Sequence, residues 1–284
     1  MIRHLMKFLL CISVSFLAVG LTMKGCVKSS ESQKDIRSND PELSTVAAST
    51  APPVKPLAKF TQKIAGTSVE IEMIPIPAGP DTAPFYASST EQTWDLYDVF
   101  IFKLDSAEGS STPESDAITR PSKPYVMTDR GYGHQGYAFL SATPAAAEKF
   151  VEWLSEKTGR TYRIPTIAEQ RFMLEKSGVT AENLQEFAWI QDNADWTTHP
   201  VGSKPADALG LHDLWGNLAE YAVKPDGTYV VVGGSWIDPA EEVTMEYEKP
   251  FTTDWNADDP QIPKSIWWMA SNDWVGIRLV CDPE

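Results

Sequence analysis

Two stretches of the chain show apolar side chains at helical spacing. Thr93 to Phe102 is one, where apolar residues three and four positions apart (Trp94, Tyr97, Phe100 and Ile101) form one face. The other begins at Thr143, a good N-cap, with Pro144 in the first helical position. Its apolar stripe consists of Ala147, Phe150, Val151 and Leu154, and Gly159 is a typical helix terminator. Both patterns predict amphipathic helices.

A third helix and two strands follow from shorter signals. Thr166 and Glu169 form a capping-box pattern, which predicts a helix that ends at Gly178. Residues 69–74 alternate apolar and polar, which predicts a half-buried strand that the following prolines end. The apolar run 229–232 predicts another strand. Turns are frequent after Gly178 and no repeat occurs, so the pattern favours an irregular α+β fold.

Residues 1–26 have the features of an export signal. Phe8 to Leu21 is an almost wholly apolar stretch, too short to span a bilayer comfortably, and it follows a basic start formed by Arg3, His4 and Lys7. An uncleaved N-terminal anchor is the alternative. Cys26 follows Gly25, which raises a further alternative, lipidation of Cys26 as in a bacterial lipoprotein.

The next segment, residues 27–58, is expected to be a disordered linker. It is rich in serine, contains Ala51-Pro52-Pro53 and has few large apolar residues, so it cannot build a core. A single folded domain is expected over residues 59–284.

Composition narrows the possible partners. The chain has 24 Lys and Arg against 39 Asp and Glu, a formal charge of −15, and removal of residues 1–26 takes away three basic residues and no acid, which leaves −18. Such a surface argues against nucleic-acid binding and repels anionic membranes. Membrane contact is therefore expected only through an N-terminal lipid or signal anchor. Three cysteines are too few for a disulfide-dense scaffold.

Several short phrases occur in a characteristic order along the chain. They are Ile74-Pro75-Ile76-Pro77-Ala78-Gly79, Glu91-Gln92-Thr93-Trp94, Trp153-Leu154-Ser155 with Thr158-Gly159-Arg160-Thr161-Tyr162-Arg163-Ile164-Pro165-Thr166, Thr198-His199-Pro200-Val201-Gly202, Gly210-Leu211-His212-Asp213-Leu214-Trp215-Gly216-Asn217-Leu218-Ala219-Glu220, Gly233-Gly234-Ser235-Trp236 and Gly276-Ile277-Arg278. Together they resemble the formylglycine-generating enzyme (sulfatase-modifying factor) family from about Phe60 to Cys281. The resemblance implies one irregular, C-type-lectin-like α+β domain, in which these phrases maintain the fold.

The chemistry of that family is not expected in this chain. The resemblance implies copper(I) held by two cysteines just before the Gly-Phe-Arg phrase, and soft thiolates suit that metal. Residues 263–275 contain no cysteine, and Cys281 lies after Arg278. We therefore expect no copper and a pseudoenzyme.

Other reactions fit the sequence less well. A branch of the family uses iron held by three histidines, but no pair among His134, His199 and His212 has helical spacing. Ser235 does not lie in a nucleophile-elbow motif, which argues against serine hydrolysis.

Structural calcium is what the resemblance implies instead. Glu220 matches the family's calcium-binding glutamate, and the co-ligands would be the carbonyl groups of Trp215, Gly216 and Leu218. A second site is expected at Asn193 and Asp195. The alternative for Glu220 is a pairing with a cation or a loop-capping role.

The remaining candidate surface is the family's substrate groove. The resemblance predicts that this chain has a binding groove formed by Trp267, Trp268, Trp274, Arg278, His134 and Tyr137. Exposed Trp and Tyr are good anchors for a peptide, a protein or a glycan, whereas the alternative is that most of these residues belong to the core.

These observations predict an exported binding or structural module at the cell envelope, either periplasmic, anchored as a lipoprotein or at the cell surface. Two alternatives stay open. One is a divergent enzyme of the family that acts on exported sulfatases or on another protein, with Asn272 and Asp273 as further candidate polar groups. The other is a structural lipoprotein of an envelope assembly.

Overall fold

The computed structural model describes residues 57–105 and 127–284. The predicted export signal, Cys26 and almost all of the predicted linker lie outside the described residues. Over the described ranges, no helix is long and apolar enough to cross a bilayer. The elements alternate irregularly between helix and strand, which confirms the α+β class. In chain order they are β1 (Phe60–Lys63), β2 (Glu70–Ile76), β3 (Phe85–Ser88), α1 (Trp94–Phe102), α3 (Pro144–Thr158), β4 (Tyr162–Arg163), α4 (Ile167–Lys176), α5 (Leu184–Phe187), β5 (Ala219–Val223), β6 (Tyr229–Val232), β7 (Lys249–Pro250), a 3-10 helix (Thr253–Asn256), β8 (Val275–Gly276) and β9 (Val280–Cys281).

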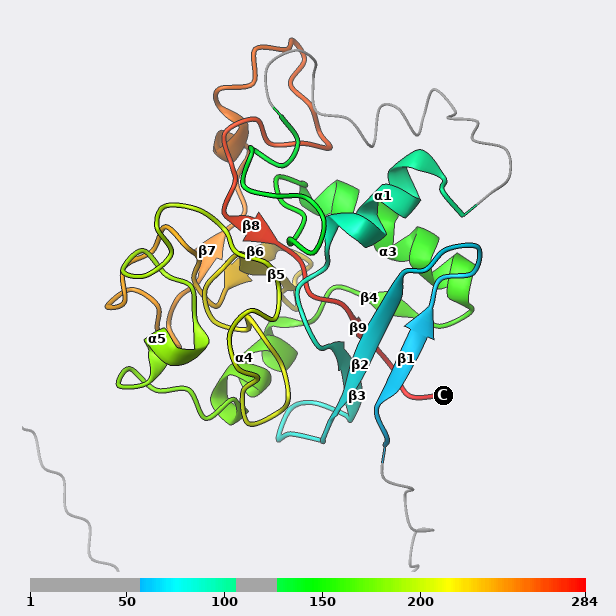
Figure 1. The fold of residues 1–284 in the computed structure, drawn as a ribbon, viewed down its shortest axis with the longest axis vertical. Coiled ribbons are helices and arrows are strands. Elements are labelled where there is room, and N and C mark those ends of the chain that lie inside the picture. Colours follow the sequence, from blue (N-terminus) through cyan, green and yellow to red (C-terminus); the bar gives the residue numbers. More distant parts are fainter. Residues whose placement is uncertain (1–56, 106–126) are drawn as a thin grey trace, which may run out of the picture. The chain divides into compact units, whose positions relative to one another are not determined.

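One sheet joins the first strands of the domain to the last. Its strand order is β1-β2-β3-β9-β4, and all its neighbours are antiparallel. β9, drawn in red in Figure 1, lies between β3 and β4. Cys281 lies opposite Tyr86 on one side and Tyr162 on the other. Cys281 therefore lies on an inner strand of the sheet, and its side chain is fully buried in the core.

A second sheet carries the strand with Glu220. Its order is β7-β6-β5-β8, with β5 and β8 parallel and the other pairs antiparallel. Glu220 pairs with Gly276 in the parallel register. This pairing brings the two most recognisable phrases of the sequence, around Glu220 and around Arg278, side by side.

The three predicted helices are present, two of them with the predicted N-caps, whereas α1 has no side-chain cap and α4 ends at Lys176, before the predicted Gly178. The Thr143 hydroxyl accepts a hydrogen bond from the backbone N–H of Ala146, and Gly159 ends α3 in the left-handed conformation (φ 76°). Thr166 and Glu169 form the complete capping box at the start of α4. Satisfied end groups of this kind fix where a helix begins and ends.

The predicted strand 69–74 is longer than expected at its C-terminal end. β2 continues through Pro75 to Ile76, and Pro75 pairs with Tyr86 of β3. Met73 is the last residue of β2 that pairs with β1, so the strand is at the sheet edge where Pro75 occurs. Proline is tolerated at such edges, because no ladder hydrogen bond is lost on the open side.

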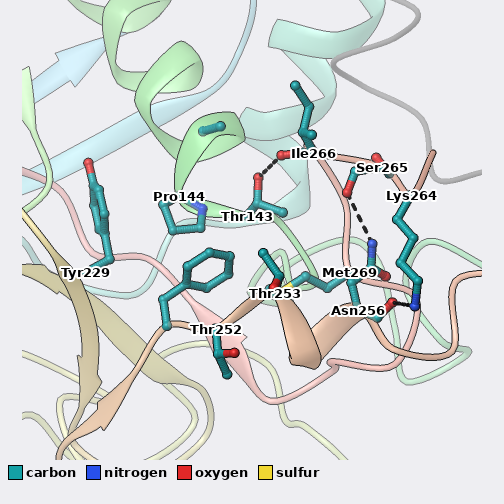
Figure 2. A pocket seen from close by; sticks show the side chains of 12 residues that line it. Thr143, Pro144, Tyr229, Thr252, Thr253, Asn256, Lys264, Ser265, Ile266 and Met269 are labelled. Carbon is teal, nitrogen blue, oxygen red and sulfur yellow. Dashed lines mark hydrogen bonds between the residues drawn. The ribbon is translucent and has the colours of Figure 1, made fainter.

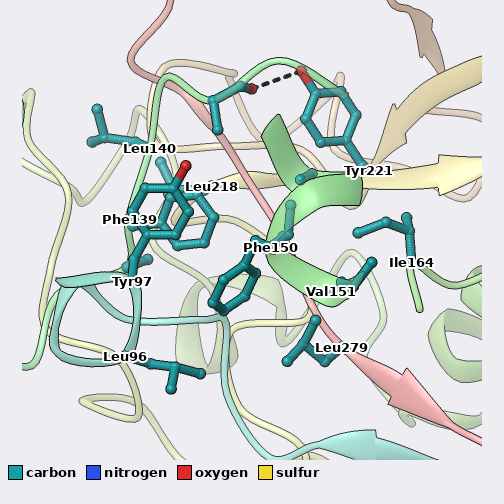
Figure 3. Packing of buried hydrophobic residues seen from close by; sticks show 14 of the residues in the cluster. Leu96, Tyr97, Phe139, Leu140, Phe150, Val151, Ile164, Leu218, Tyr221 and Leu279 are labelled. Atoms are coloured by element: carbon teal, nitrogen blue, oxygen red, sulfur yellow. Dashed lines mark hydrogen bonds between the residues drawn. The ribbon is translucent and has the colours of Figure 1, made fainter. Parts of the chain in front are cut away.

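The core around α1 and α3 is aromatic. Tyr97 stacks on Phe139 with ring centroids 4.0 Å apart, and Phe150 of α3 lies 5.3 Å from Tyr97. Figure 3 shows these rings between Leu96, Leu140 and Leu279. Nearby, the Tyr221 hydroxyl donates to the Ala142 carbonyl at 3.1 Å. This packing fixes the N-terminal end of α3, where the candidate site begins.

Candidate functional site

An apolar pocket of about 410 Å³ lies at the N-terminal end of α3. Figure 2 shows α3, the 3-10 helix and the segment 264–269 enclosing it. Apart from hydroxyl groups, one amide and one lysine, its lining is apolar. The lining residues are Thr143, Pro144, Ala145, Tyr229, Phe251, Thr252, Thr253, Asn256, Lys264, Ser265, Ile266 and Met269.

The N-cap of α3 ties two walls of the pocket together. The Thr143 hydroxyl donates to the Ile266 carbonyl at 2.6 Å, and the Thr143 N–H donates to the Trp267 carbonyl at 3.0 Å. The N–H of Met269 donates to the Ser141 carbonyl at 2.8 Å. The residues that start the helix therefore also position the segment 264–269.

Asn256 and Lys264 join the 3-10 helix, which forms the third wall of the pocket, to the segment 264–270. The Asn256 side chain accepts from the Ala270 N–H at 2.6 Å and donates to the Ser265 carbonyl at 3.1 Å. The Lys264 ammonium group donates to the carbonyls of Asn256 and Ala257. The charge of Lys264 is thus used inside the loop, and its stem contributes apolar surface to the pocket.

The rim of the pocket is partly apolar. Ile266 lines the pocket and is 65% exposed, and Ile262 in the same loop is 98% exposed. The Tyr229 hydroxyl donates to the Glu148 carboxylate at the edge. Large exposed aliphatic side chains beside a hollow are typical of binding surfaces. The lining contains no carboxylate, histidine or cysteine that could act as a base or a nucleophile.

Two residues of the predicted groove are in the core. Trp268 is 2% exposed and Arg278 is 0% exposed, so the prediction that they line an open groove is wrong. Trp268 stacks on Trp94 at 6.4 Å, and its neighbour Met269 reaches the pocket instead. The large aromatic surface of Trp268 is buried against Trp94 and is not exposed to solvent.

The other predicted groove residues do not converge on the pocket. Trp274 packs edge-on against Trp255 at 4.8 Å, and Trp255 packs against Phe251 of the lining. Trp267 is half-buried against the core. His134 lies in a different hollow, of about 310 Å³, on the other side of Trp94. Tyr137 belongs to the same turn-rich loop as His134, and its carbonyl accepts from the Trp94 N–H.

Glu220 forms a buried ion pair with Arg278. Its carboxylate accepts from the Arg278 guanidinium at 2.7 and 3.0 Å and from the Gln170 amide at 2.7 Å. Burial raises the pKa of Glu220 above its ordinary value despite the charge of Arg278. Because both oxygens already accept N–H groups, this carboxylate does not fit the predicted calcium-ligand role. Its predicted alternative, a pairing with a cation, is what the structure shows.

The backbone and side-chain N–H groups of the segment 215–218 form hydrogen bonds within the fold. The N–H of Gly216 donates to the Gly233 carbonyl at 3.0 Å, and the N–H of Leu218 donates to the Glu91 carboxylate at 2.8 Å. These bonds use the N–H groups, so the predicted calcium-ligand role of the carbonyl groups of Trp215, Gly216 and Leu218 stays a prediction. The Trp215 indole N–H donates to the Ser177 hydroxyl at 3.0 Å. These contacts make the segment 215–220 a structural junction.

Asn193 also acts within the fold. Its side-chain oxygen accepts from the Ile190 N–H at 2.9 Å, and its amide group donates to the carbonyls of Gln185 and Ala188. Asp195 is exposed two residues later. Asn193 therefore stabilises its own loop, and the second calcium site expected at Asn193 and Asp195 stays a prediction.

Over the described ranges, no three His, Cys, Asp or Glu side chains are grouped so that they could hold a metal ion. Glu91, Asp213 and Glu220 are three buried acids whose charges act on one another. Burial and the charges of the other two raise the pKa of Glu91 well above its ordinary value, although Asn217 and Leu218 donate to it. This polar cluster, like the Glu220–Arg278 pair, connects the loops of the fold.

Only some of the residues that form the pocket could be predicted from the sequence. The segment around Ile266 and Met269 lies within the predicted groove region, whereas Tyr229 starts β6, Phe251 follows β7 and Asn256 ends the 3-10 helix. No motif in the sequence marks these three residues. Only tertiary packing brings these distant segments to the start of α3.

Two solved structures have a fold similar to that of this chain. Treponema denticola variable protein 1 is 18% identical, with a TM-score of 0.57 over 80% of this chain and 100% of that chain. PvdO from Pseudomonas aeruginosa is 20% identical, with a TM-score of 0.55 over 81% of this chain and 100% of that chain. At these identities the likeness concerns the fold alone. No curated protein matches the sequence.

The family follows from the sequence match. Residues 143–283 match the family described as "Sulfatase-modifying factor enzyme 1-like domain". The chain thus carries a domain of the sulfatase-modifying factor family over these residues, which confirms the resemblance for the phrases from Trp153 onward, whereas the phrases at 74–79 and 91–94 lie before the matched range.

Proposed function

We propose that the domain is a binding module whose apolar pocket receives an apolar part of a polypeptide. The observation that carries this proposal is the pocket itself, which is open and mainly apolar and whose lining residues include no carboxylate, histidine or cysteine. Its volume of about 410 Å³ lies in the range of ligand sites. Exposed Ile266 at the rim would be covered by the partner, which provides a hydrophobic gain.

A polypeptide is the partner class that the family favours. The matched family takes its name from a factor that modifies sulfatases, which are themselves proteins. We therefore infer that the fold has kept the ability to hold a protein segment, and that in this chain binding is the whole activity.

Cysteine chemistry supports the absence of copper-dependent oxidation. Cys281 is the only cysteine after Cys26, so no pair of thiolates can form within the domain. Cys281 is also buried in β9, and burial raises its pKa to about 11, which keeps the sulfur protonated. A copper(I) site of this kind needs soft ligands in the thiolate form.

The proposed place of action is the cell envelope. The basic, apolar and serine-rich succession over residues 1–58 supports export, with or without a lipid at Cys26. The strongly acidic composition supports a protein that stays off anionic lipid surfaces unless it is anchored.

A peptide-display selection on the purified full-length chain tests the binding role. Selected peptides are expected to bind less well to Ile266→Ser, which removes the exposed rim of the pocket. Ile262→Ser is the matched control, because Ile262 is equally apolar and lies in the same loop but does not line the pocket. Equal binding to both variants, or no selectable peptide, would argue against the pocket.

A second assay addresses the chemistry. The chain is incubated with copper(I), a reductant, oxygen and a Cys-x-Pro-x-Arg peptide, and the peptide mass is followed. We expect no conversion of the cysteine to the aldehyde above a copper-only control. Conversion would contradict the non-catalytic role.

A further inference from the structure

We propose that His134 is a proton-operated latch that holds one wall of the apolar pocket in its binding shape. The proposal rests on the proposed function for its consequence, which is ligand binding that depends on pH. Its structural part concerns only the loop 127–137 and the segment 268–272, and it can be tested without a ligand.

Both ring nitrogens of His134 face carboxylates. Nε2 lies 2.8 Å from Asp98 Oδ2 on α1, and Nδ1 lies 3.3 Å from Asp129 Oδ2 in the loop. A neutral imidazole has one N–H and can donate to only one of these oxygens, whereas the imidazolium donates to both. The geometry therefore selects the protonated ring, which joins α1 to the loop.

Besides Asp98, one acid among the described residues lines the hollow around the ring. Asp95 is the remaining charged residue of this hollow, and its carboxylate accepts from the Gly136 N–H at 2.7 Å. The turn between β1 and β2 contributes only Gly66, Thr67, Ser68 and Val69. Burial lowers the pKa of His134, but the hydrogen bonds and charges of Asp98 and Asp129 outweigh burial, so the pKa is raised above its ordinary value.

Asp129 carries the effect of the latch to the pocket wall. It directly precedes Arg130, and its second oxygen accepts from the Gly131 N–H at 2.9 Å. The Arg130 guanidinium donates to the carbonyls of Met269 and Ala270 at 2.8 and 2.7 Å. Met269 lines the pocket, so the same turn that pairs with His134 also positions the wall.

A second route runs through stacked rings. His134 stacks on Trp94 with centroids 5.2 Å apart, and Trp94 stacks on Trp268 at 6.4 Å, with interplanar angles of 15° and 11°. A positive imidazolium over an indole face gains a cation–π attraction that the neutral ring lacks. Trp268 is the neighbour of Met269, so both routes end at the same segment.

The direction of the pH effect follows from the sign of the charge. Because His134 binds its proton more tightly in the folded chain, the latch is complete at low pH and is lost as pH rises through the raised pKa. Above that pKa the Asp98 and Asp129 contacts weaken, Arg130 loses its fixed turn, and the wall at Met269 becomes mobile.

The decisive experiment is an NMR titration of the purified full-length chain. The ring resonances of His134 should titrate with a midpoint above about 6.5, the ordinary histidine value. The amide resonances of Met269 and Ala270 should shift with the same midpoint. In His134→Asn this shift should disappear, and in Asp98→Asn the His134 midpoint should fall. His199→Asn is the control, since His199 stacks on Trp189 in another part of the fold.

The outcomes separate the latch from the pocket. Amides of Met269 and Ala270 that ignore the His134 midpoint, or a midpoint at or below the ordinary value, would overturn the latch. Indole serves as the apolar probe: its affinity should fall about threefold above the midpoint, the size of one partly exposed ion pair, and should not vary with pH in His134→Asn. If Ile266→Ser leaves indole binding unchanged, the pocket fails as a binding site while the amide titration still decides the latch.

Discussion

The guanidinium of Arg278 lies 2.7 Å from the Glu220 carboxylate, and the two side chains are 0% and 2% exposed. Arg278 also donates to the carbonyls of Ser88 and His212 at 2.8 and 2.7 Å. A single side chain thus joins β5, the end of β3 and the loop before the second sheet. The sequence phrase that contains Arg278 is explained by this structural role.

Removal of one member of this pair should be strongly destabilising. Arg278→Met leaves the Glu220 charge buried without a cation, and such changes typically cost about 3–5 kcal/mol of unfolding free energy. Urea unfolding would measure the loss. Lys59→Ala, which removes an exposed ion pair with Glu72, is the control and should cost about 0–1 kcal/mol. Similar losses for both variants would contradict the central role of Arg278.

Gly216 should not tolerate a side chain. A Cβ there would lie 2.3 Å from the Trp189 carbonyl oxygen, and the residue has a φ of 72°. Gly131→Ala is the matched control, because Gly131 has a similar φ of 78° but open space around it. The control should lose about 1–2 kcal/mol from backbone strain alone, and Gly216→Ala should lose clearly more. Thermal unfolding of the two variants would compare them.

Glu169 should make the fold sensitive to acid. Burial raises its pKa, but the hydrogen bonds from Arg163 and Thr166 outweigh burial, so the pKa is lowered below its ordinary value. The stability that Glu169 provides is therefore present above the ordinary carboxyl pKa and is lost as pH falls through the lowered one.

Glu169→Gln tests this dependence. At neutral pH the variant should lose about 1–2 kcal/mol, since it keeps a cap but loses the paired contacts of Arg163 at 2.7 Å. Below the lowered pKa the difference from the unchanged protein should shrink, which unfolding curves at several pH values would show. A difference that stays constant with pH would contradict the assignment.

The intact mass of the exported protein tests the proposed lipid anchor. If Cys26 is acylated, the mature chain should begin at Cys26 and carry a large mass increment, and Cys26→Ser should release it from the membrane fraction. Two or more acyl chains would be needed for stable anchoring, because a single chain binds only marginally. A mature chain without the mass increment would contradict lipidation of Cys26 and would leave an export signal without a lipid anchor.

Local sequence signals were sufficient to predict the helices, whereas the short strands depend on tertiary contacts. Thr143, Gly159 and Thr166 mark helix ends through short-range hydrogen bonds, so their elements could be predicted. Strands β4, β7, β8 and β9 have two residues each and show no periodicity, so the sequence could not reveal them.

The pocket was harder to predict than the fold. Trp268 and Trp267 are adjacent and chemically alike, yet one is buried and the other half-buried, which composition cannot distinguish. The pocket also depends on Tyr229 and Phe251, whose approach to Pro144 requires the completed β6–β7 pair. Sequence reasoning identified the region around Met269 only through the family resemblance.

The position of β9 has a consequence for how the chain reaches its native state. β9 lies between β3 and β4, so the first sheet stays divided until residues near 280 have been made. Pairing partners nearly two hundred positions apart impose a high contact order and hence slow folding. Truncation before Val280 would remove the strand that joins the two halves of the sheet, and proteolysis at this end should unravel the domain rather than trim it.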